Sequence, residues 1–271
     1  MSAAKPQAGP QPAGKAERVA KLIARAGICS RREAERLIAQ GRVAVDGDTL
    51  DTPAVTVDDP RRITVDGERL PANEPPRLWR YHKPAGVVTT HSDPQGRPTL
   101  FDQLSDDLPR VISIGRLDLN SEGLILLTND GGLARHLELP ATGWLRRYRA
   151  RVLGVVDNKA LAALEDGVEI EGVRYGPIKA ALDRQVGANA WVTVALREGK
   201  NREVRRVLQH LGLKVSRLIR TAYGPFQIGA LKASEIAEVP QKVLREQLGA
   251  TYAALDGIGA KRGHADRRRK A

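Results

Sequence analysis

The sequence predicts an α+β protein with two folded domains, and three observations support this. The chain has 271 residues, a length that suggests about two domains at roughly 100–200 residues each. Hydrophobic residues make up 41% of it, which is enough apolar material for packed cores and excludes global disorder. Helical and strand-like patterns both occur, and the proline-rich stretch at 71–77 separates two regions of different composition. We therefore expect domains at 17–72 and 77–250, between disordered tails at 1–16 and 251–271.

The charge and the cysteine content narrow the possible partners and the compartment. Lys and Arg exceed Asp and Glu by 44 to 32, so the net charge is +12. This surplus favours an acidic partner, with nucleic acid first and an anionic membrane second, although excess charge can also serve solubility alone. The sequence has no apolar run of about 18 residues, which excludes a transmembrane helix, and no secretory signal pattern. Together with the single Cys29, which cannot form an intramolecular disulfide, these features predict a cytoplasmic protein.

The first region predicts two short helices followed by β-hairpins. An apolar stripe with helical spacing runs over 19–26, and Gly27 follows it where a left-handed C-cap would end a helix. Ser30 and Glu33 have the spacing of a capping box, so a second helix is expected to begin there and to end at Gly41. Alternating residues around an Asp-Gly pair, the signature of a tight hairpin, occur twice, at 43–50 and 63–70.

The helices of this region carry several basic side chains, and their pattern is similar to that of a known RNA-binding domain. The string CSRREAERLI, followed by GRVAVDG, resembles the S-four domain, which is named after a small-subunit ribosomal protein. The resemblance covers about 17–65 and implies that a basic face binds structured RNA through its shape and phosphates. An ordinary solvated helix face is the alternative. The residues implied to contact RNA are Lys21, Arg31, Arg32 and Arg36.

In the second region, a polar loop between two apolar runs carries the first candidate for chemistry. The runs VISI and LILLT are expected to be buried strands, and the loop GRLDLNSEG between them contains Asp118 close to Arg116. A loop held between two strands can present a catalytic group rigidly, but a loop aspartate can equally cap a turn. No metal-ligand spacing, Walker loop or dinucleotide fingerprint occurs, so we expect no metal and no cofactor. Any chemistry must then use side chains alone.

Two arginine-rich segments follow this loop. In 144–154, alternation places three arginines on one face of a strand and Tyr148 on the opposite face, which favours a core position for this tyrosine. The segment 194–212 predicts a strand, a Gly-Lys-Asn turn and a helix that carries several arginines. Of these, Arg205 adjoins the apolar stripe of the helix and could point inward. An inward arginine needs a carboxylate partner, and Asp118 is the obvious candidate.

These motifs together are similar to those of one enzyme family. GRLDLNSEGLILLTNDG, RRYRARV, EGKNREVRRVLQHLG and VSRLIRTAYG resemble the RsuA/RluB family of pseudouridine synthases, and with the S-four domain they cover most of 17–230. The resemblance implies a catalytic domain with a mixed, largely antiparallel sheet flanked by helices. It also implies isomerisation of a uridine within ribosomal RNA, without metal or cofactor. The implied site residues are the essential Asp118, the active-site Tyr148, the inward Arg205 and Leu218, which packs beneath the target base.

The chemistry of this family is consistent with these residues. Breaking the bond between ribose and base develops positive charge on the sugar, which a carboxylate can stabilise or attack. Arg205 would keep Asp118 ionised, and Tyr148 would stack on the base or remove its C5 proton. The groups expected to bind the flanking RNA are Arg116, the turn residues Lys200 and Asn201, and Arg202 and Arg206 of the helix.

The expected substrate is large-subunit ribosomal RNA, either free or in a pre-ribosomal particle, and the basic C-terminal tail favours this branch of the family. A small-subunit target is the nearest alternative. The competing class is a non-catalytic RNA-binding assembly factor that keeps only the fold. A pure binder has no need for a loop aspartate with an inward arginine, so the enzyme is favoured. We expect a monomer without membrane contact.

Overall fold

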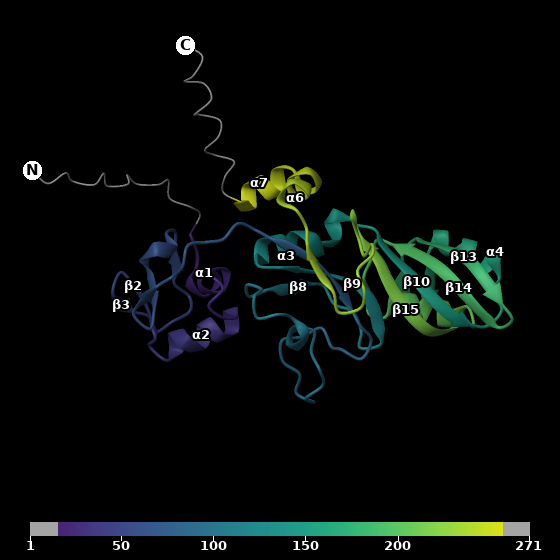
Figure 1. Cartoon of the computed structure of the whole chain (residues 1–271), viewed down its shortest axis with the longest axis horizontal. Coiled ribbons are helices and arrows are strands. Elements are labelled where there is room, and N and C mark those ends of the chain that lie inside the picture. The colour runs from purple at the N-terminus through teal and green to yellow at the C-terminus, as the bar shows by residue number, and fades with distance from the viewer. Residues whose placement is uncertain (1–15, 257–271) are drawn as a thin grey trace, which may run out of the picture. The chain divides into compact units, whose positions relative to one another are not determined.

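The computed structural model describes residues 16–256 of the chain. The chain divides into two compact units, with the boundary between Glu74 and Pro75. Each unit has its own sheet and its own hydrophobic core. The colours of Figure 1 follow the chain from purple in the N-terminal unit to yellow at the last helix of the C-terminal unit.

The N-terminal unit packs two helices against a four-stranded antiparallel sheet of order β3-β2-β5-β6. The helices are α1 (Val19–Arg25) and α2 (Arg31–Ala39), and a 3-10 turn spans Pro60–Arg62. The strands of the sheet are β2 (Val43–Val45), β3 (Asp48–Thr49), β5 (Ile63–Val65) and β6 (Glu68–Arg69). A separate two-stranded ladder pairs β1 (Glu17–Arg18) with β4 (Thr56–Val57).

The cap and turn residues recognised in the sequence begin and end these elements. The N–H of Glu33 donates to Ser30 Oγ at 3.1 Å, so Ser30 caps α2 as expected. Gly27 follows α1 with a φ of +82°. The first hairpin turns at Asp46 and Gly47, with φ of +54° and +95°, and the Asp-Gly pair of the second hairpin has the same left-handed backbone. The two predicted helices and the two predicted hairpins are confirmed.

The C-terminal unit is built on a nine-stranded mixed sheet whose main order is β13-β14-β10-β15-β9-β7-β17. Its paired strands are antiparallel except β9 and β15, which are parallel and lie near the middle. Two more strands join this path, since β8 pairs with β9 and β16 pairs with β15. The strands are β7 (Leu78–Lys83), β8 (Ile112–Ile114), β9 (Ser121–Thr128), β10 (Arg146–Leu153), β13 (Ile178–Val186), β14 (Asn189–Leu196), β15 (Lys214–Tyr223), β16 (Phe226–Gln227) and β17 (Ile236–Glu238). The expected mixed, largely antiparallel sheet is confirmed.

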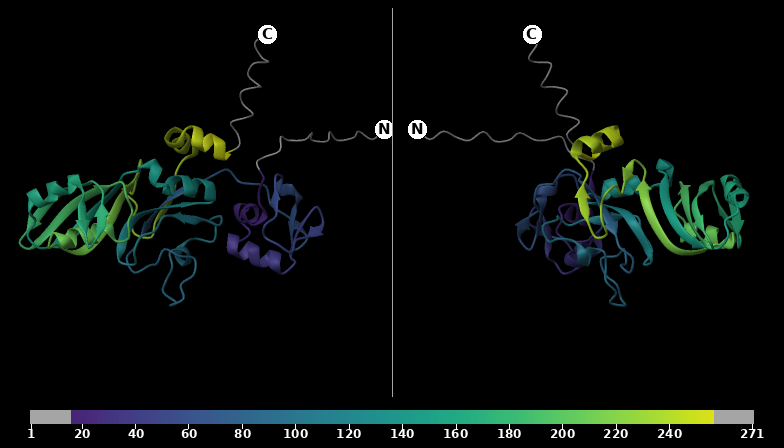
Figure 2. Two further views of the ribbon diagram at one scale, coloured as in Figure 1. Left: turned by 180° about the vertical axis from the view of Figure 1, so that it is seen from behind. Right: turned by 45° about the vertical axis from the view of Figure 1, so that its right-hand side comes forward.

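Five α-helices, a small hairpin and three 3-10 turns complete this unit within the described residues, and the turns span Phe101–Gln103, Pro140–Thr142 and Leu164–Asp166. The helices are α3 (Gly131–Glu138), α4 (Asn158–Ala163), α5 (Glu203–His210), α6 (Gln241–Leu248) and α7 (Ala250–Asp256). The hairpin pairs β11 (Val168–Ile170) with β12 (Val173–Tyr175). Helices α3, α6 and α7 lie close together at one end of the unit, whereas α4 lies beside β13 at the other (Figures 1 and 2).

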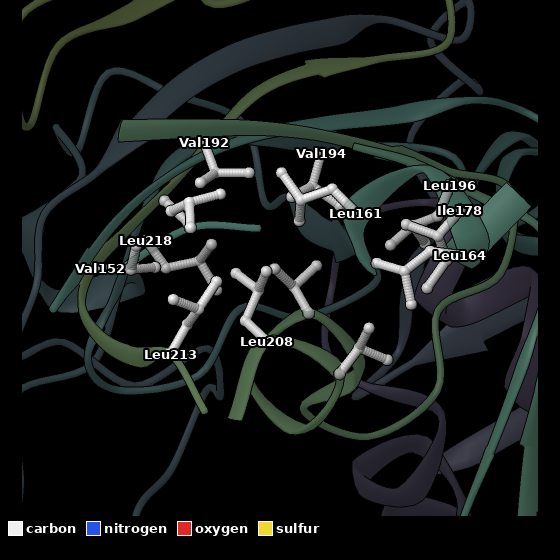
Figure 3. Close-up of a cluster of buried hydrophobic side chains, with 14 of the residues drawn as sticks. Val152, Leu161, Leu164, Ile178, Val192, Val194, Leu196, Leu208, Leu213 and Leu218 are labelled. Carbon is white, nitrogen blue, oxygen red and sulfur yellow. The ribbon is translucent and has the colours of Figure 1, made fainter. Parts of the chain in front are cut away.

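Three clusters of buried side chains form the core of the C-terminal unit. The largest lies between α4, α5 and one face of the sheet, where Val192 and Val194 face Leu208 (Figure 3). On β9, Leu124 and Leu126 belong to a second cluster, with α3, α6 and α7. Their neighbours Ile125 and Leu127 point to the opposite face, where the segment between β7 and β8 covers a third cluster.

Alternation along β10 separates its arginines from its apolar side chains. Ala150 and Val152 are buried in the cluster shared with α4 and α5, whereas Arg147, Arg149 and Arg151 are exposed. Tyr148 is half-buried and lies on the side of Ala150, so the predicted opposition of tyrosine and arginines is confirmed.

The predicted C-terminal tail is corrected in part. Residues 251–256 were expected to belong to a disordered tail, but they form most of α7. Tyr252 is buried there, and its hydroxyl donates to the carbonyl of Pro76 at 3.1 Å. Tyr252 and Leu255 both pack in the second cluster, on β9 and α3. Their spacing of three places both on one helical face, a pattern too short to stand out beside the basic residues that follow. The rest of that tail, 257–271, and residues 1–15 lie outside the described residues.

Candidate active site

Asp118 lies in a short loop whose backbone is tied down on both sides. The loop spans 115–120 between β8 and β9, because β9 begins three residues earlier than the apolar run suggested. Before Asp118, Thr89 Oγ1 donates to the carbonyl of Leu117 at 3.0 Å. After it, the N–H of Gly86 donates to the carbonyl of Leu119 at 2.8 Å. The carboxylate itself stays 31% exposed, so a rigid loop presents an accessible charge.

The buried side chain of Lys83 also holds the Asp118 loop in place through hydrogen bonds. This lysine is fully buried at the end of β7, and its Nζ donates to the carbonyls of Pro84 and Ser121, both at 2.9 Å, and to Leu119 at 3.4 Å. Burial lowers the pKa of Lys83 to about 8, and the nearby carboxylates of Asp118 and Glu122 only partly oppose this. This role was not recognised from the sequence, where Lys83 is simply the first residue of a Lys-Pro-x-Gly corner at 83–86.

We expect the stability of the protein to rise with pH in a way that depends on Lys83. Its pKa is about 8 in the folded chain and 10.5 ordinarily, so between these values the folded state binds fewer protons than the unfolded state. Within this window the free energy of unfolding then rises by up to about 1.4 kcal/mol for each pH unit. Below the window Lys83 is charged in both states, and the destabilising effect of its buried charge is present in full. In urea unfolding from pH 7.5 to 9.5, the free energy of unfolding of the wild type should rise relative to that of Lys83→Met. The exposed Lys242→Met is the control, and a difference that stays flat with pH would contradict the titration.

The cation nearest to Asp118 is not the predicted one. Arg202 Nη1 lies 3.8 Å from Asp118 Oδ2, whereas Arg205 lies beyond 4.0 Å and donates its Nη2 to the carbonyl of Asn120 at 2.8 Å. The expected Asp118–Arg205 ion pair is therefore wrong, and so is the placement of Arg202 on the helix. Arg202 precedes α5 with a left-handed φ of +53°, which takes its side chain off the helical path.

Arg205 still acts on the loop and on the local electrostatics. It is half-buried, and it also donates to the carbonyl of Val215 at 3.4 Å. Burial lowers the pKa of Arg205, Arg202 lowers it further, and Asp118 opposes both, so the carboxylate is close enough to be felt. The guanidinium thus fixes the loop through Asn120 rather than pairing with Asp118 directly. A catalytic part for Arg205 stays a prediction.

Strand pairing brings Tyr148 and Leu218 next to the Asp118 loop. Leu218 of β15 pairs with Ala150 on one side and with Ser121 on the other, three residues after Asp118. Tyr148 is two residues from Ala150 on the same face, and it packs against both the α5 cluster and the β7–β9 cluster that contains Leu117. Tyr148 and Leu218 therefore lie on one face of the sheet, beside the start of β9, which directly follows the Asp118 loop.

Arg220 and Gly123 mark the place where β9 and β15 separate. The parallel ladder ends at this pair. Arg220 is buried, its Nε donates to the carbonyl of Leu124 at 2.7 Å, and its guanidinium lies over the ring of Tyr223 at 5.3 Å. A Cβ on Gly123 would lie 2.7 Å from the backbone nitrogen of Arg220 and closer still to its oxygen. The strands that carry the site can therefore approach only because residue 123 has no side chain.

The turn before α5 is held by a buried acid. Glu203 is almost fully buried, and its Oε2 accepts from the backbone N–H of Lys200 at 2.9 Å. Burial raises the pKa of Glu203, and the hydrogen bond from Lys200 opposes this. Lys200 donates its Nζ to the carbonyl of Arg174 at 2.7 Å and pairs with Glu198. The sequence reading missed Glu203, which fixes the turn that places Arg202 near Asp118.

The residues predicted to bind RNA are mostly exposed, but some of them are already paired. In the C-terminal unit, Arg116, Lys200, Asn201, Arg202 and Arg206 are exposed. In the N-terminal unit, Arg31 and Arg32 are exposed on α2, whereas Lys21 pairs with Glu17, and Arg36 with Glu33. Surface pairs of this kind exchange readily with phosphates because each is worth at most about 1 kcal/mol. RNA contact by these residues stays a prediction.

Residues 16–256 contain neither a membrane-spanning helix nor a cluster of metal ligands. No helix there is long and apolar enough to cross a membrane, and no group of three or more His, Cys, Asp or Glu side chains could hold a metal ion.

Comparison with known proteins places both units in families. The family described as RNA pseudouridylate synthase matches residues 77–210, and the S4 (S-four) domain matches residues 17–60. A Rickettsia felis protein named "Uncharacterized RNA pseudouridine synthase" is 50% identical over 230 residues, which are 85% of this chain and 100% of that protein. A Haemophilus influenzae protein named "Ribosomal large subunit pseudouridine synthase B" is 40% identical over 240 residues, covering 83% of this chain and 66% of its own length. The Yersinia pestis protein of the same name is 41% identical, covering 78% of this chain and 69% of its own.

A solved structure agrees with these matches. The chain described as "Crystal structure of pseudouridylate synthase" superposes with a TM-score of 0.60 at 27% sequence identity, over 85% of this chain and 99% of that one. The fold and the relatives over most of the length lead to the same assignment. The chain belongs to the family of RNA pseudouridylate synthases, with an S-four domain at its N-terminus.

Proposed function

We propose that this pseudouridine synthase isomerises a uridine of large-subunit ribosomal RNA, with Asp118 as the group that acts at the sugar. The observation that carries the proposal is the Asp118 loop. Its backbone is anchored by Thr89, Gly86, Lys83 and Arg205, yet its carboxylate remains 31% exposed. A carboxylate that only capped a turn would accept hydrogen bonds from backbone N–H groups. The carboxylate of Asp118 accepts no such hydrogen bond among the described residues.

The reaction breaks one bond to the sugar and makes another. The bond between N1 of uracil and C1′ of ribose is cleaved, and positive charge develops on the sugar as in glycoside cleavage. The Asp118 carboxylate stabilises that charge or attacks C1′, and the guanidinium of Arg202, 3.8 Å away, helps to orient the carboxylate. The base then turns and bonds to C1′ through C5, which loses its proton, while N1 gains one.

Tyr148 and Leu218 form the surface on which the free base turns. Leu218 is buried and Tyr148 is half-buried on the same face, so the pair offers an apolar floor and an aromatic wall. The target uridine must first leave its helix or loop, which costs a few kcal/mol. The cationic side chains of Arg116, Lys200 and Arg206 and the amide of Asn201 would offset that cost through phosphate contacts. We also propose that Arg31 and Arg32 of the S-four domain bind structured RNA.

The choice of large-subunit RNA follows from the relatives that carry this target in their names, at 40% and 41% identity. Because the S-four domain reads RNA mainly by shape, the motif alone does not set the nucleotide. We further propose that the protein acts in the cytoplasm as a monomer, without membrane contact.

Release of tritium from RNA labelled at uridine C5 tests the proposal directly. Wild-type protein should release tritium from large-subunit transcripts or particles and not from small-subunit ones, and sequencing the product should show one pseudouridine. Release from small-subunit RNA only would contradict the target. Absence of release from both RNAs, free and assembled, would contradict the activity and favour a non-catalytic assembly factor.

A further inference from the structure

The face of the sheet that points away from Tyr148 and Leu218 carries a second basic surface. It lies on β10, β13, β14 and β15, the four strands at the right of Figure 1. Strand register sets its rows, because Arg151 pairs with Trp191 on β14 and Arg217 on β15, and Trp191 pairs in turn with Arg184 on β13. We call this surface the outer basic face, and it consists of Arg147, Arg149, Arg151, Lys179, Arg184, Trp191 and Arg217.

This face is open to solvent over the described residues. Helices α4 and α5 pack on the opposite side of the same strands, where the apolar side chains of β10 and β14 point. On the outer basic face the arginines of β10 are exposed, and Trp191 is half-buried.

The positive charge of this face is only partly neutralised within the protein. Arg149 pairs with Asp183 at 3.1 Å and Arg217 pairs with Glu122 at 2.8 Å. The remaining four cations have no ion pair within the described residues; they are Arg147, Arg151, Lys179 and Arg184. Four unpaired cations on one face attract a polyanion, and guanidinium groups suit phosphates because of their planar, forked donors.

Trp191 adds an aromatic ring to this face, which a surface that binds only phosphates would not need. Its ring lies under the guanidinium of Arg149 at 4.9 Å, and it forms a wall of a surface pocket of about 200 Å³. The other lining residues include Arg151 and Arg184, which are two of the unpaired cations, and Val186, whose side chain is largely exposed. An aromatic wall between two guanidinium groups matches the way single-stranded nucleic acids are held, with a base on the ring and phosphates beside it.

We propose that the outer basic face binds single-stranded RNA, with a base stacked on Trp191 and the flanking phosphates on Arg151 and Arg184. The inference rests on the proposed function only for the source of the strand, which would be an unpaired segment of the RNA that carries the target uridine. The face lies on the side of the sheet opposite to Tyr148, so it binds a segment other than the one in the active site. It adds affinity and selects RNA whose unpaired flank can reach it.

Titration of a dye-labelled 12-nucleotide oligouridylate, followed by fluorescence anisotropy, gives the Kd of every variant. The tryptophan emission is recorded in parallel, because Trp191 reports on its own surface. Arg151→Gln with Arg184→Gln removes two phosphate contacts, so we expect at least a tenfold weaker Kd near 100 mM salt. The slope of log K against log salt should fall in magnitude by about 1.4, at about 0.7 per single-strand contact. Trp191→Ala should weaken binding about 5- to 150-fold, whereas Trp191→Phe should retain affinity and lose the fluorescence change.

The matched control removes two charges from exposed lysines elsewhere in the same unit, Lys232→Gln with Lys242→Gln. If the control weakens binding as much as the arginine pair, or if the arginine pair leaves the Kd and slope unchanged, the proposal is overturned. Equal affinity of Trp191→Ala and wild type overturns base stacking, and competition by polyglutamate as strong as by RNA overturns RNA as the occupant. The oligonucleotide needs no target site, so the two proposals can fail separately. If the variants lose affinity as expected but the wild-type protein shows no isomerase activity, the proposed function is contradicted and the proposal for this face is not.

Discussion

Asp118→Asn is expected to abolish isomerisation while leaving the fold and the RNA affinity nearly unchanged. The substitution keeps the shape of the side chain and removes the negative charge. Because the carboxylate is 31% exposed and its one ion pair within the described residues is Arg202 at 3.8 Å, little stability depends on that charge. The positive charge that develops on the sugar then has no counter-ion, and an amide cannot attack C1′.

The loss of turnover should be at least about a thousandfold, the upper range for removing one electrostatic contact to a developing charge. Single-turnover release of tritium from C5-labelled RNA measures it, with filter binding and a thermal melt on the same preparations. Asp106→Asn, an exposed loop aspartate elsewhere in the C-terminal unit, is the control and should be fully active. A folded Asp118→Asn protein that keeps even a tenth of wild-type activity would rule out the assigned role.

Gly123→Ala is expected to destabilise the protein more than a Gly→Ala substitution at an exposed turn does. Residue 123 has a φ of +103°, a backbone that strains an alanine. The added Cβ would lie 2.7 Å from the backbone nitrogen of Arg220, and backbone cannot move aside as a flexible side chain can. Strain and overpacking together should lower the free energy of unfolding by about 3 kcal/mol or more.

Gly187→Ala is the matched control, because its φ is +57° and no atom lies within 4 Å of the added Cβ. It carries the strain without the clash, so it should cost about 1–2 kcal/mol. Urea unfolding followed by tryptophan fluorescence measures both, since Trp79, Trp144 and Trp191 all lie in the C-terminal unit. Equal losses in the two variants would mean that β9 and β15 can separate without cost. A destabilised but folded Gly123→Ala protein should also lose activity, because Leu218 lies on β15 and the Asp118 loop leads directly into β9.

Much of the local structure could be predicted because its causes act within a few residues. Ser30 caps α2 through an N–H three residues away, and the Asp-Gly pairs adopt the left-handed turn that their hairpins require. The same holds for β10, where alternation separates Tyr148 from its arginine neighbours. The prediction failed at α7, where two apolar residues, Tyr252 and Leu255, acquire their helix only by packing on a distant cluster.

The candidate site could be predicted only as a set of residue names. The motifs and their resemblance to a family named Asp118, Tyr148, Arg205 and Leu218, and no local pattern states which cation meets which carboxylate. In the structure Arg202 approaches Asp118, because its left-handed backbone precedes α5, whereas Arg205 turns to the carbonyl of Asn120. Lys83 beneath the loop and Glu203 beneath the turn were not recognised, since burial is what gives each its role.

The chain's family, its two-part organisation and the aspartate proposed for its chemistry can all be read from residue order. Caps, turns and alternation depend on φ preferences and hydrogen bonds between near neighbours, and these act before the chain is compact. The pairing of Leu218 with Ser121 and of Arg220 with Gly123 joins segments far apart in sequence. That register follows from packing of the whole sheet, so it decides which strand residues lie beside the Asp118 loop and which arginines are neighbours of Trp191.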